Sequence, residues 1–324
     1  MKKFLIHVGI FSLSLILLAG GIEYMLRQVP NPLAFKRSLL ENNAQKTKTL
    51  VIGSSVVNCS VNPVFLSDST YNLAISGEWF RFNQALLEKY IDELPQLKHV
   101  IWGICLHSLW SDDSKEVDES SLINHKIYMG IAREDDCLHN VELPYLGSLA
   151  LRKWSKYYIQ GRSTMPCDSL GVDHSYDHTK KEKDWLEEIP RLVRNQHKPM
   201  LADKNGELYR TNIRRMHDVA KLCHERGIRL YLVMPPVHPD YYRLADKKQL
   251  ELTLKAASEI ASQWNNVSCY NYFNDYRFTD DDFYDGNHLN STVGATKFSK
   301  ILKNDLPISC KKLSKTDRFI GTRI

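Results

Sequence analysis

The stretch Leu50-Val51-Ile52-Gly53-Ser54-Ser55 decides the fold that this sequence predicts. A short apolar run ended by a glycine is typical of a strand buried inside a parallel sheet. Gly53 allows a sharp turn, and a helix is expected to begin near Ser55. Ser55 then lies just beyond the carboxyl end of the first strand, where open α/β sheets place their active sites.

Strands and helices alternate along much of the remaining chain. Further strands are predicted at 71–74, 99–104, 229–234 and 267–272, and helices at 79–94, 213–223, 250–264 and 292–302. This alternation predicts an α/β domain whose parallel sheet of about five strands is covered by helices on both faces. The segment 108–206 is rich in charged and aromatic residues and lacks this rhythm, so we interpret it as a large insertion.

The N-terminus carries a candidate membrane segment. Lys2 and Lys3 precede an apolar run from Phe4 to Ile22, which is long enough at helical rise to cross a hydrocarbon core. The positive-inside rule then exports everything that follows. The run is longer than a usual signal-peptide core, which favours an uncleaved signal anchor over a signal peptide cut near Ala19-Gly20-Gly21.

The chain is thereby divided into four parts. These are a signal anchor or transmembrane helix at 1–27, a stalk at 28–46, the α/β domain with its insertion at 47–305, and a basic tail at 306–324. The tail has a surplus of four positive charges, so it supplies most of the net charge of +5. We find no nucleic-acid-binding pattern, and the seven dispersed cysteines predict no disulfide framework.

A second informative stretch is Asp285-Gly286-Asn287-His288-Leu289, which precedes the last predicted helix. A carboxylate three residues before a histidine can accept a hydrogen bond from one ring nitrogen and fix the tautomer of the ring. The other nitrogen can then take a proton from a serine hydroxyl. Ser55, His288 and Asp285 are therefore the candidate nucleophile, base and base-orienting acid of serine acyl-transfer chemistry.

Three blocks of this sequence resemble those of the SGNH (GDSL-type) hydrolases. Gly53-Ser54-Ser55-Val56 stands where that superfamily has Gly-Asp-Ser-Leu, and Asn72-Leu73-Ala74-Ile75-Ser76-Gly77 is similar to its second block. Asp285-Gly286-Asn287-His288-Leu289 is similar to its closing Asp-x-x-His-Leu block. The resemblance covers about 48–110 and 207–304. It implies a flavodoxin-like three-layer αβα sandwich, with the Gly77 N–H in the oxyanion hole beside the Ser55 N–H.

The sequence departs from the family pattern at two places. Ser54 replaces the Asp or Asn that usually precedes the nucleophile. The third block, Gly-x-Asn-Asp in the family, supplies an Asn side chain to the oxyanion hole, whereas this chain has Gly103-Ile104-Cys105-Leu106. Asn58, Asn72 and Asn83 are candidate substitutes. Ser54, Asn72, Gly77 and His238 complete the predicted oxyanion and substrate-binding set.

The segments Val61-Asn62-Pro63 and 95–100 resemble membrane-anchored bacterial members of the superfamily, some of which move acyl groups on surface polymers. The resemblance implies a serine esterase or O-acyltransferase, tethered to the periplasmic side of the inner membrane. Its expected substrate is an acyl ester, in particular acetyl, of a cell-surface glycan or other polymer, and it needs no cofactor. The alternative is a degenerate member that binds or assembles surface polysaccharide without catalysis.

Other polar clusters carry weaker hypotheses. His174 and His178 are four apart beside acidic residues, which is compatible with zinc, but no third ligand is evident and no metal site is predicted. His107 and Trp110 follow the third strand and are candidates for the cleft. The run Asp280-Asp281-Asp282 is interpreted as a solvated loop rather than a calcium site.

Overall fold

The computed structural model describes residues 1–67, 69–111, 119–132, 140–162, 165–181, 183–308 and 319–321. The chain divides into two compact units. Unit 1 comprises Met1–Arg37 and Ser114–Met165, and unit 2 comprises Ser38–Asp113 and Pro166–Ile324. The predicted insertion is therefore shared between the two units.

Unit 2 is built on a parallel sheet with strand order β2-β1-β3-β4-β5-β6. The strands are β1 (Thr49–Ile52), β2 (Thr70–Asn72), β3 (His99–Gly103), β4 (Arg229–Met234), β5 (Val267–Asn271) and β6 (Phe319–Gly321). The order 2-1-3-4-5 is that of flavodoxin-like sheets, so the predicted fold class is confirmed. The short β6, which lies in the predicted tail, adds a sixth strand beside β5.

The first strand ends as the sequence predicts. Leu50, Val51 and Ile52 are buried, and Gly53 has a φ of +135°. A Cβ atom at Gly53 would lie 3.0 Å from the carbonyl oxygen of Gly103 and 2.8 Å from a methyl group of Val57. Only glycine therefore allows the turn that carries the chain from β1 into the next helix at this packing distance.

Helices cover the sheet and are long where apolar residues recur at helical spacing. In unit 2 they are α3 (Ser55–Asn58), α4 (Phe80–Tyr90), α8 (Ile189–Ala202), α9 (Glu207–Glu225), α10 (Pro239–Leu244), α11 (Lys247–Gln263) and α12 (Val293–Asp305), with α2 (Pro32–Asn43) crossing from unit 1. Most of the predicted stalk is therefore helical, and Leu40 of α2 is fully buried.

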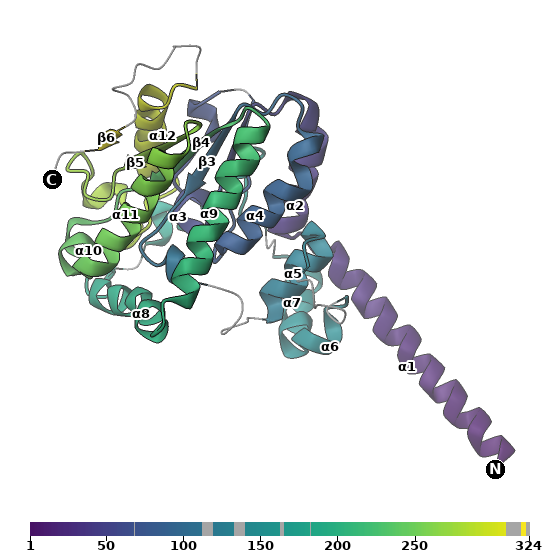
Figure 1. Ribbon diagram of the computed structural model, residues 1–324. Coiled ribbons are helices and arrows are strands. Elements are labelled where there is room, and N and C mark those ends of the chain that lie inside the picture. Colours follow the sequence, from purple (N-terminus) through teal and green to yellow (C-terminus); the bar gives the residue numbers. More distant parts are fainter. Residues whose placement is uncertain are drawn as a thin grey trace. The chain divides into compact units, whose positions relative to one another are not determined.

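Figure 1 shows α4, α9 and α11 across one face of the sheet. Right-handed crossovers place α3 and α12 on the other face. Hydrogen bonds from Asn62 N to Ser299 Oγ, and from Ser299 Oγ to Ser60 O, join the segment after α3 to α12. The result is a three-layer sandwich in which the segment after α3 lies beside α12, the last helix of the domain.

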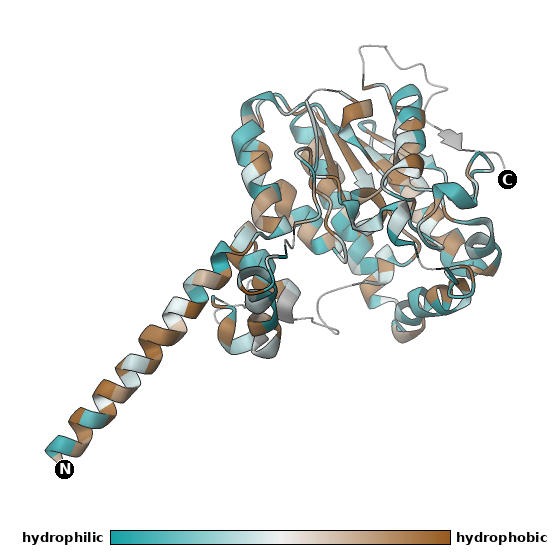
Figure 2. Cartoon of the chain, turned by 180° about the vertical axis from the view of Figure 1, so that it is seen from behind, coloured by the Kyte–Doolittle hydropathy of each residue, from teal (hydrophilic) through white to brown (hydrophobic). Residues whose placement is uncertain are grey.

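Unit 1 contains α1 (Lys2–Gln28), α5 (Glu119–Asn124), a π-helical turn (His125–Met129), α6 (Leu143–Leu146) and α7 (Ser148–Tyr158). Among the described residues, α1 is the one helix long and apolar enough to cross a membrane. Its apolar length is visible in Figure 2, where most of the helix is brown. Length and composition thus agree with the predicted anchor.

Candidate active site

The serine block lies at the carboxyl edge of the sheet, between β1 and β3. Ser55 is the first residue of α3, and Ser54 occupies the N-cap position before it. In the strand order, the chain goes from β1 outward to β2 and from β3 in the other direction to β4. The carboxyl ends of β1 and β3 therefore form the topological switch point of the sheet. Ligands of open α/β sheets bind in the crevice at such a point.

The histidine block forms a tight loop at the same edge. Phe283 and Leu289 pair as an isolated β-bridge, and the Tyr284 N–H donates to the carbonyl oxygen of His288. Inside the loop, Asp285 Oδ1 accepts hydrogen bonds from the backbone N–H groups of Asn287 and His288, at 3.0 and 2.9 Å. The carboxylate is therefore held in place by the backbone of its own loop.

Folding joins the two blocks in one chain of hydrogen bonds. His288 Nδ1 lies 2.9 Å from each carboxylate oxygen of Asp285, and His288 Nε2 lies 2.7 Å from Ser55 Oγ. A carboxylate on Nδ1 places the ring proton there and leaves Nε2 to accept the hydroxyl proton of Ser55. The hydroxyl, the imidazole and the carboxylate thus have the order and spacing that a serine nucleophile requires.

The electrostatics of the loop keep Asp285 ionised. Burial by itself raises the pKa of this carboxyl, but the charge and hydrogen bond of His288 and the two backbone N–H groups lower it below its ordinary value. An ionised Asp285 stabilises the imidazolium that forms when His288 takes a proton.

The predicted oxyanion donors are the backbone N–H groups of Ser55 and Gly77. Gly77 is the third residue of a turn closed by the hydrogen bond from Glu78 N to the Ile75 carbonyl, and it has a φ of +78°. Such a turn favours glycine at this position. Within the described part of the chain, neither the Ser55 nor the Gly77 N–H donates to another protein group. Both remain available to a ligand oxygen.

The candidate substitutes for the third-block Asn are all engaged in other contacts. Asn72 is fully buried, and its amide donates to the carbonyl oxygens of Val57 and Val61 while accepting from Ala74 N. Asn83 donates to its own helix at Trp79 O. Asn58 donates to Ser76 Oγ and Asp173 Oδ2, both at 3.2 Å. Asn72 is therefore a structural residue and is no longer an oxyanion candidate.

His238, predicted to line the substrate cleft, instead braces the histidine loop. Its ring is almost fully buried, with Nε2 3.0 Å from Asp280 Oδ1 and Nδ1 accepting from Asp240 N at the start of α10. Its backbone N–H donates to the carbonyl oxygen of Gly286. Because both ring nitrogens are occupied and the ring is enclosed, His238 positions the loop and does not face the cleft.

The insertion supplies contacts that the sequence did not predict. The Tyr176 ring lies 4.7 Å from the His288 ring and 5.3 Å from the Tyr284 ring, centroid to centroid, and its hydroxyl is 3.4 Å from Ser76 Oγ. Gly171 makes this approach possible. It has a φ of +90°, and a Cβ there would lie 2.0 Å from the Asn72 carbonyl oxygen. One glycine and one tyrosine in a charged segment gave no signal of this role.

A buried thiol lies behind the serine block. Cys105 Sγ is 3.9 Å from Ser54 Oγ, 3.0 Å from Ser108 Oγ and 3.6 Å from His107 Nδ1. Burial raises the pKa of this thiol, but the charge and hydrogen bond of His107, with the two serine hydroxyls, lower it to about 6. Cys105 in turn raises the pKa of His107 against the effect of burial. Ser54 therefore turns its hydroxyl toward the hydrogen-bonded side chains of Cys105 and His107.

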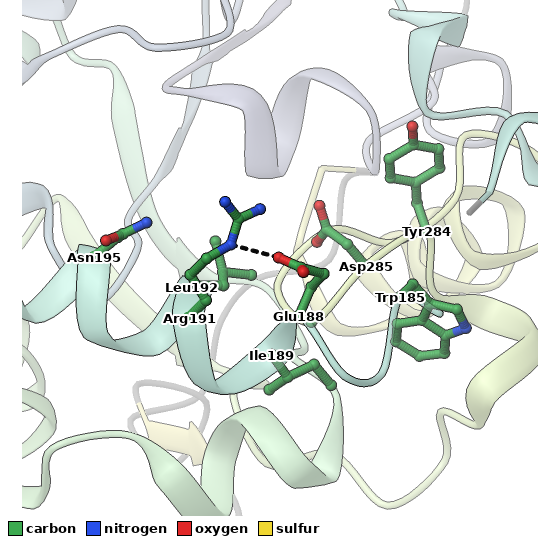
Figure 3. A pocket seen from close by; sticks show the side chains of 9 residues that line it. Trp185, Glu188, Ile189, Arg191, Leu192, Asn195, Tyr284 and Asp285 are labelled. Carbon is green, nitrogen blue, oxygen red and sulfur yellow. Dashed lines mark hydrogen bonds and ion pairs between the residues drawn. The ribbon is translucent and has the colours of Figure 1, made fainter. Parts of the chain in front are cut away.

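A cavity of about 330 Å³ adjoins the Asp285 side of the site. Figure 3 shows Arg191 and Asn195 of α8 lining it together with Asp285 and Tyr284 of the histidine loop. Arg191 is paired with Glu188 at 2.5 Å, and its side chain is 70% exposed. The cavity thus combines aromatic and charged groups from the insertion with the acid of the candidate triad.

The other predicted clusters form no metal site in the described residues. His174 Nε2 lies 3.1 Å from Asp168 Oδ2, while the side chain of His178 is outside the described residues. Asp282 binds Lys297 at 2.6 Å and caps its own turn, and Asp280 pairs with His238. Trp110 is buried against Tyr209, at 5.3 Å between ring centroids.

Comparisons with known proteins include a distant structural neighbour. No family model matches the chain, and no curated protein matches it. A solved structure titled "a putative platelet activating factor from Streptococcus pneumonia" covers 90% of this chain and 98% of its own. The two share 14% identity with a TM-score of 0.43.

Proposed function

We propose that this chain is an SGNH-type serine ester hydrolase or O-acyltransferase, tethered to a membrane by α1 and acting outside the cytoplasm. The observation that carries the proposal is the hydrogen-bonded chain from Ser55 Oγ through His288 to Asp285, formed by residues 233 positions apart. Lys2 and Lys3 before the apolar run support the orientation.

The first half-reaction follows from the positions of these groups. Ser55 Oγ attacks the carbonyl carbon of the ester while its proton passes to His288 Nε2. The negative charge that develops on the carbonyl oxygen is stabilised by the N–H groups of Ser55 and Gly77. When the tetrahedral intermediate collapses, the ester C–O bond breaks and His288 returns the proton to the departing alkoxide. An alcohol leaves and the acyl group remains on Ser55.

The second half-reaction decides between hydrolysis and transfer. Water or a sugar hydroxyl gives its proton to His288 Nε2 and attacks the acyl carbon, and the bond to Ser55 Oγ then breaks as the serine regains its proton. The products are an acid with water as acceptor or a new ester with a sugar. We place the alcohol part of the substrate, an acyl ester of a surface glycan or other polymer, toward the cavity beside Arg191 and Asn195.

A second candidate function is supported by Cys105. Gly103-Ile104-Cys105 stands where the family pattern has Gly-x-Asn, so the third oxyanion donor is absent from that position. Loss of one such donor typically costs ~10²–10³ in rate. The chain would then be a binding or assembly factor for surface polysaccharide that keeps the fold without turnover.

An aryl acetate assay on the full-length protein in detergent separates the two functions. The enzyme proposal expects release of the aryl alcohol that is lost in Ser55→Ala and retained in Ser262→Ala, whose serine lies near the end of α11. A rate equal in wild type and Ser55→Ala would support the binding protein.

A further inference from the structure

The helical part of unit 1 is joined to the last turns of α1. The carboxylate of Glu23 accepts hydrogen bonds at 3.0 Å from the backbone N–H groups of Glu142 and Leu143, where α6 begins. The carbonyl oxygen of Met25 accepts from Tyr158 Oη at 3.0 Å, and Arg27 Nη2 donates to Asn140 O at 2.6 Å. Glu23, Met25 and Arg27, near the end of α1, are therefore hydrogen-bonded to the segment 140–158.

This attachment fixes the depth of the segment once α1 crosses a membrane. The apolar run ends at Ile22, and Glu23, Met25 and Arg27 follow within about 8 Å of helix length at 1.5 Å per residue. They then occupy the headgroup layer, which is several ångströms thick on each side of the hydrocarbon core. The α6–α7 segment, bound to these residues, lies at the same level. Figure 1 shows α6 and α7 beside this end of α1.

Apolar side chains of α7 and the residue after it face outward. Leu149 and Leu151 are each 48% exposed and Ile159 is 70% exposed. The same turns carry Trp154, Tyr157 and Tyr158, whose rings contact one another at 5.7 and 4.9 Å between centroids. Tryptophan and tyrosine are enriched at membrane–water interfaces, because their rings have an apolar body and a polar tip.

The charge of the segment is complementary to acidic lipid. Residues 140–162 contain Arg152, Lys153, Lys156 and Arg162 against the single acid Glu142. Glu142 is buried and receives hydrogen bonds from Lys153 Nζ at 3.0 Å, so the exposed charges of this segment are Arg152, Lys156 and Arg162. Basic residues beside a membrane surface are attracted to anionic headgroups.

We infer that α7 and Ile159 form a second membrane contact, embedded in the headgroup layer of an acidic phospholipid membrane beside α1. This contact rests on the membrane insertion of α1 in the proposed function. It would hold unit 1 at the bilayer surface through α7 as well as through α1.

The test places a photoreactive benzoylphenylalanine, one site at a time, in the full-length protein in phosphatidylcholine–phosphatidylglycerol vesicles. The sites are Leu17 in α1, Leu151 and Ile159 in the contact, and Tyr276, which is 85% exposed in unit 2. We expect lipid adducts at Leu17, Leu151 and Ile159, at least fivefold above the yield at Tyr276. Adducts at Leu17 with only the Tyr276 yield at Leu151 and Ile159 would overturn the contact and leave the anchor intact. No adduct at Leu17 would overturn the anchor and the contact together.

Charge reversal tests the choice of acidic lipid. Arg152→Glu combined with Lys156→Glu should lower the adduct yield at Ile159 at least threefold and leave the yield at Leu17 unchanged. Lys255→Glu on α11 is the matched control, because Lys255 is also an exposed helical lysine, 63% exposed. An Ile159 yield that is the same with and without the reversed charges would contradict attraction to anionic headgroups.

Discussion

The ring of Tyr176 lies over the imidazole of His288, with 4.7 Å between the centroids and 34° between the planes. Tyr176 follows directly from the segment that Gly171 packs against the end of β2, and its backbone carbonyl accepts from Ser291 N. Tyr176 of the insertion therefore packs against one face of the His288 ring, while Asp285 hydrogen-bonds to the edge of the ring.

Removal of the Tyr176 ring should impair catalysis through the position of His288. We expect Tyr176→Ala to lower kcat/KM for an aryl acetate by about ten- to hundredfold, since a displaced catalytic group costs this much. Tyr176→Phe keeps the ring and should stay within about threefold of wild type. Tyr276→Ala, at a tyrosine that is 85% exposed, is the control. Equal rates for Tyr176→Ala and Tyr276→Ala would show that the ring contact has no role in positioning.

Asn72 should matter for stability rather than for the oxyanion. Asn72→Ala leaves the buried carbonyl oxygens of Val57 and Val61 without their amide donor and should lower the free energy of unfolding by about 2–3 kcal/mol. Asn205→Ala, at an exposed position, should change it by less than about 0.5 kcal/mol. Denaturant unfolding of the detergent-solubilised protein measures both. Similar values for the two variants would contradict the structural role.

The cavity beside Asp285 should affect the alcohol part of the substrate. We expect Arg191→Ala to raise KM for an acetylated oligosaccharide about three- to tenfold, the loss of roughly one charge-assisted hydrogen bond. Hydrolysis of a small aryl acetate should be unchanged. Arg243→Ala is a close control, because Arg243 is 73% exposed and also pairs with an acid three residues earlier. A similar rise in KM for the oligosaccharide in both variants would show that the cavity does not bind the substrate.

His99, at the start of β3 and so at the edge of the sheet opposite the site, should make the stability of the fold depend on pH. Burial, with Arg229 and Lys98 nearby, lowers the pKa of His99 to about 4 from an ordinary 6.5. The folded protein then binds fewer protons than the unfolded chain between these values, so stability is full above pH 6.5 and falls as the pH drops toward 4. Between pH 7.5 and 5, wild type should lose about 1–2 kcal/mol more than His99→Gln. Parallel losses in both proteins would show that His99 is not the group responsible.

The sheet could be predicted because its strands are marked locally. The apolar run before Gly53 and the alternation of strands with helices identify five parallel strands, and β4 begins and ends where the sequence places it. The strand β6 was missed, because Phe319-Ile320-Gly321 is a short apolar piece in a basic tail.

The residues of the candidate site could likewise be predicted only in part. Ser55, Asp285 and His288 stand in motifs whose residue types and spacing carry their chemistry, and the structure brings them together. The position of Tyr176 could not be predicted, since it depends on packing between the insertion and β2. From the sequence, Asn72 is a candidate because the third-block Asn is absent, and His238 is a candidate because it follows the fourth strand at the same edge of the sheet. Only the folded chain shows that their hydrogen-bonding groups are used internally.

The most direct measurement is the rate and position of labelling by a fluorophosphonate, which transfers its phosphorus to an activated serine with loss of fluoride. We predict one adduct, which peptide mass spectrometry locates on Ser55 and not on the adjacent Ser54. Labelling should be at least about a hundredfold slower in His288→Gln, because the general base is lost. An adduct on another serine, or a Ser55 adduct that forms equally fast without His288, would contradict the assignment of Ser55 as nucleophile and His288 as its base.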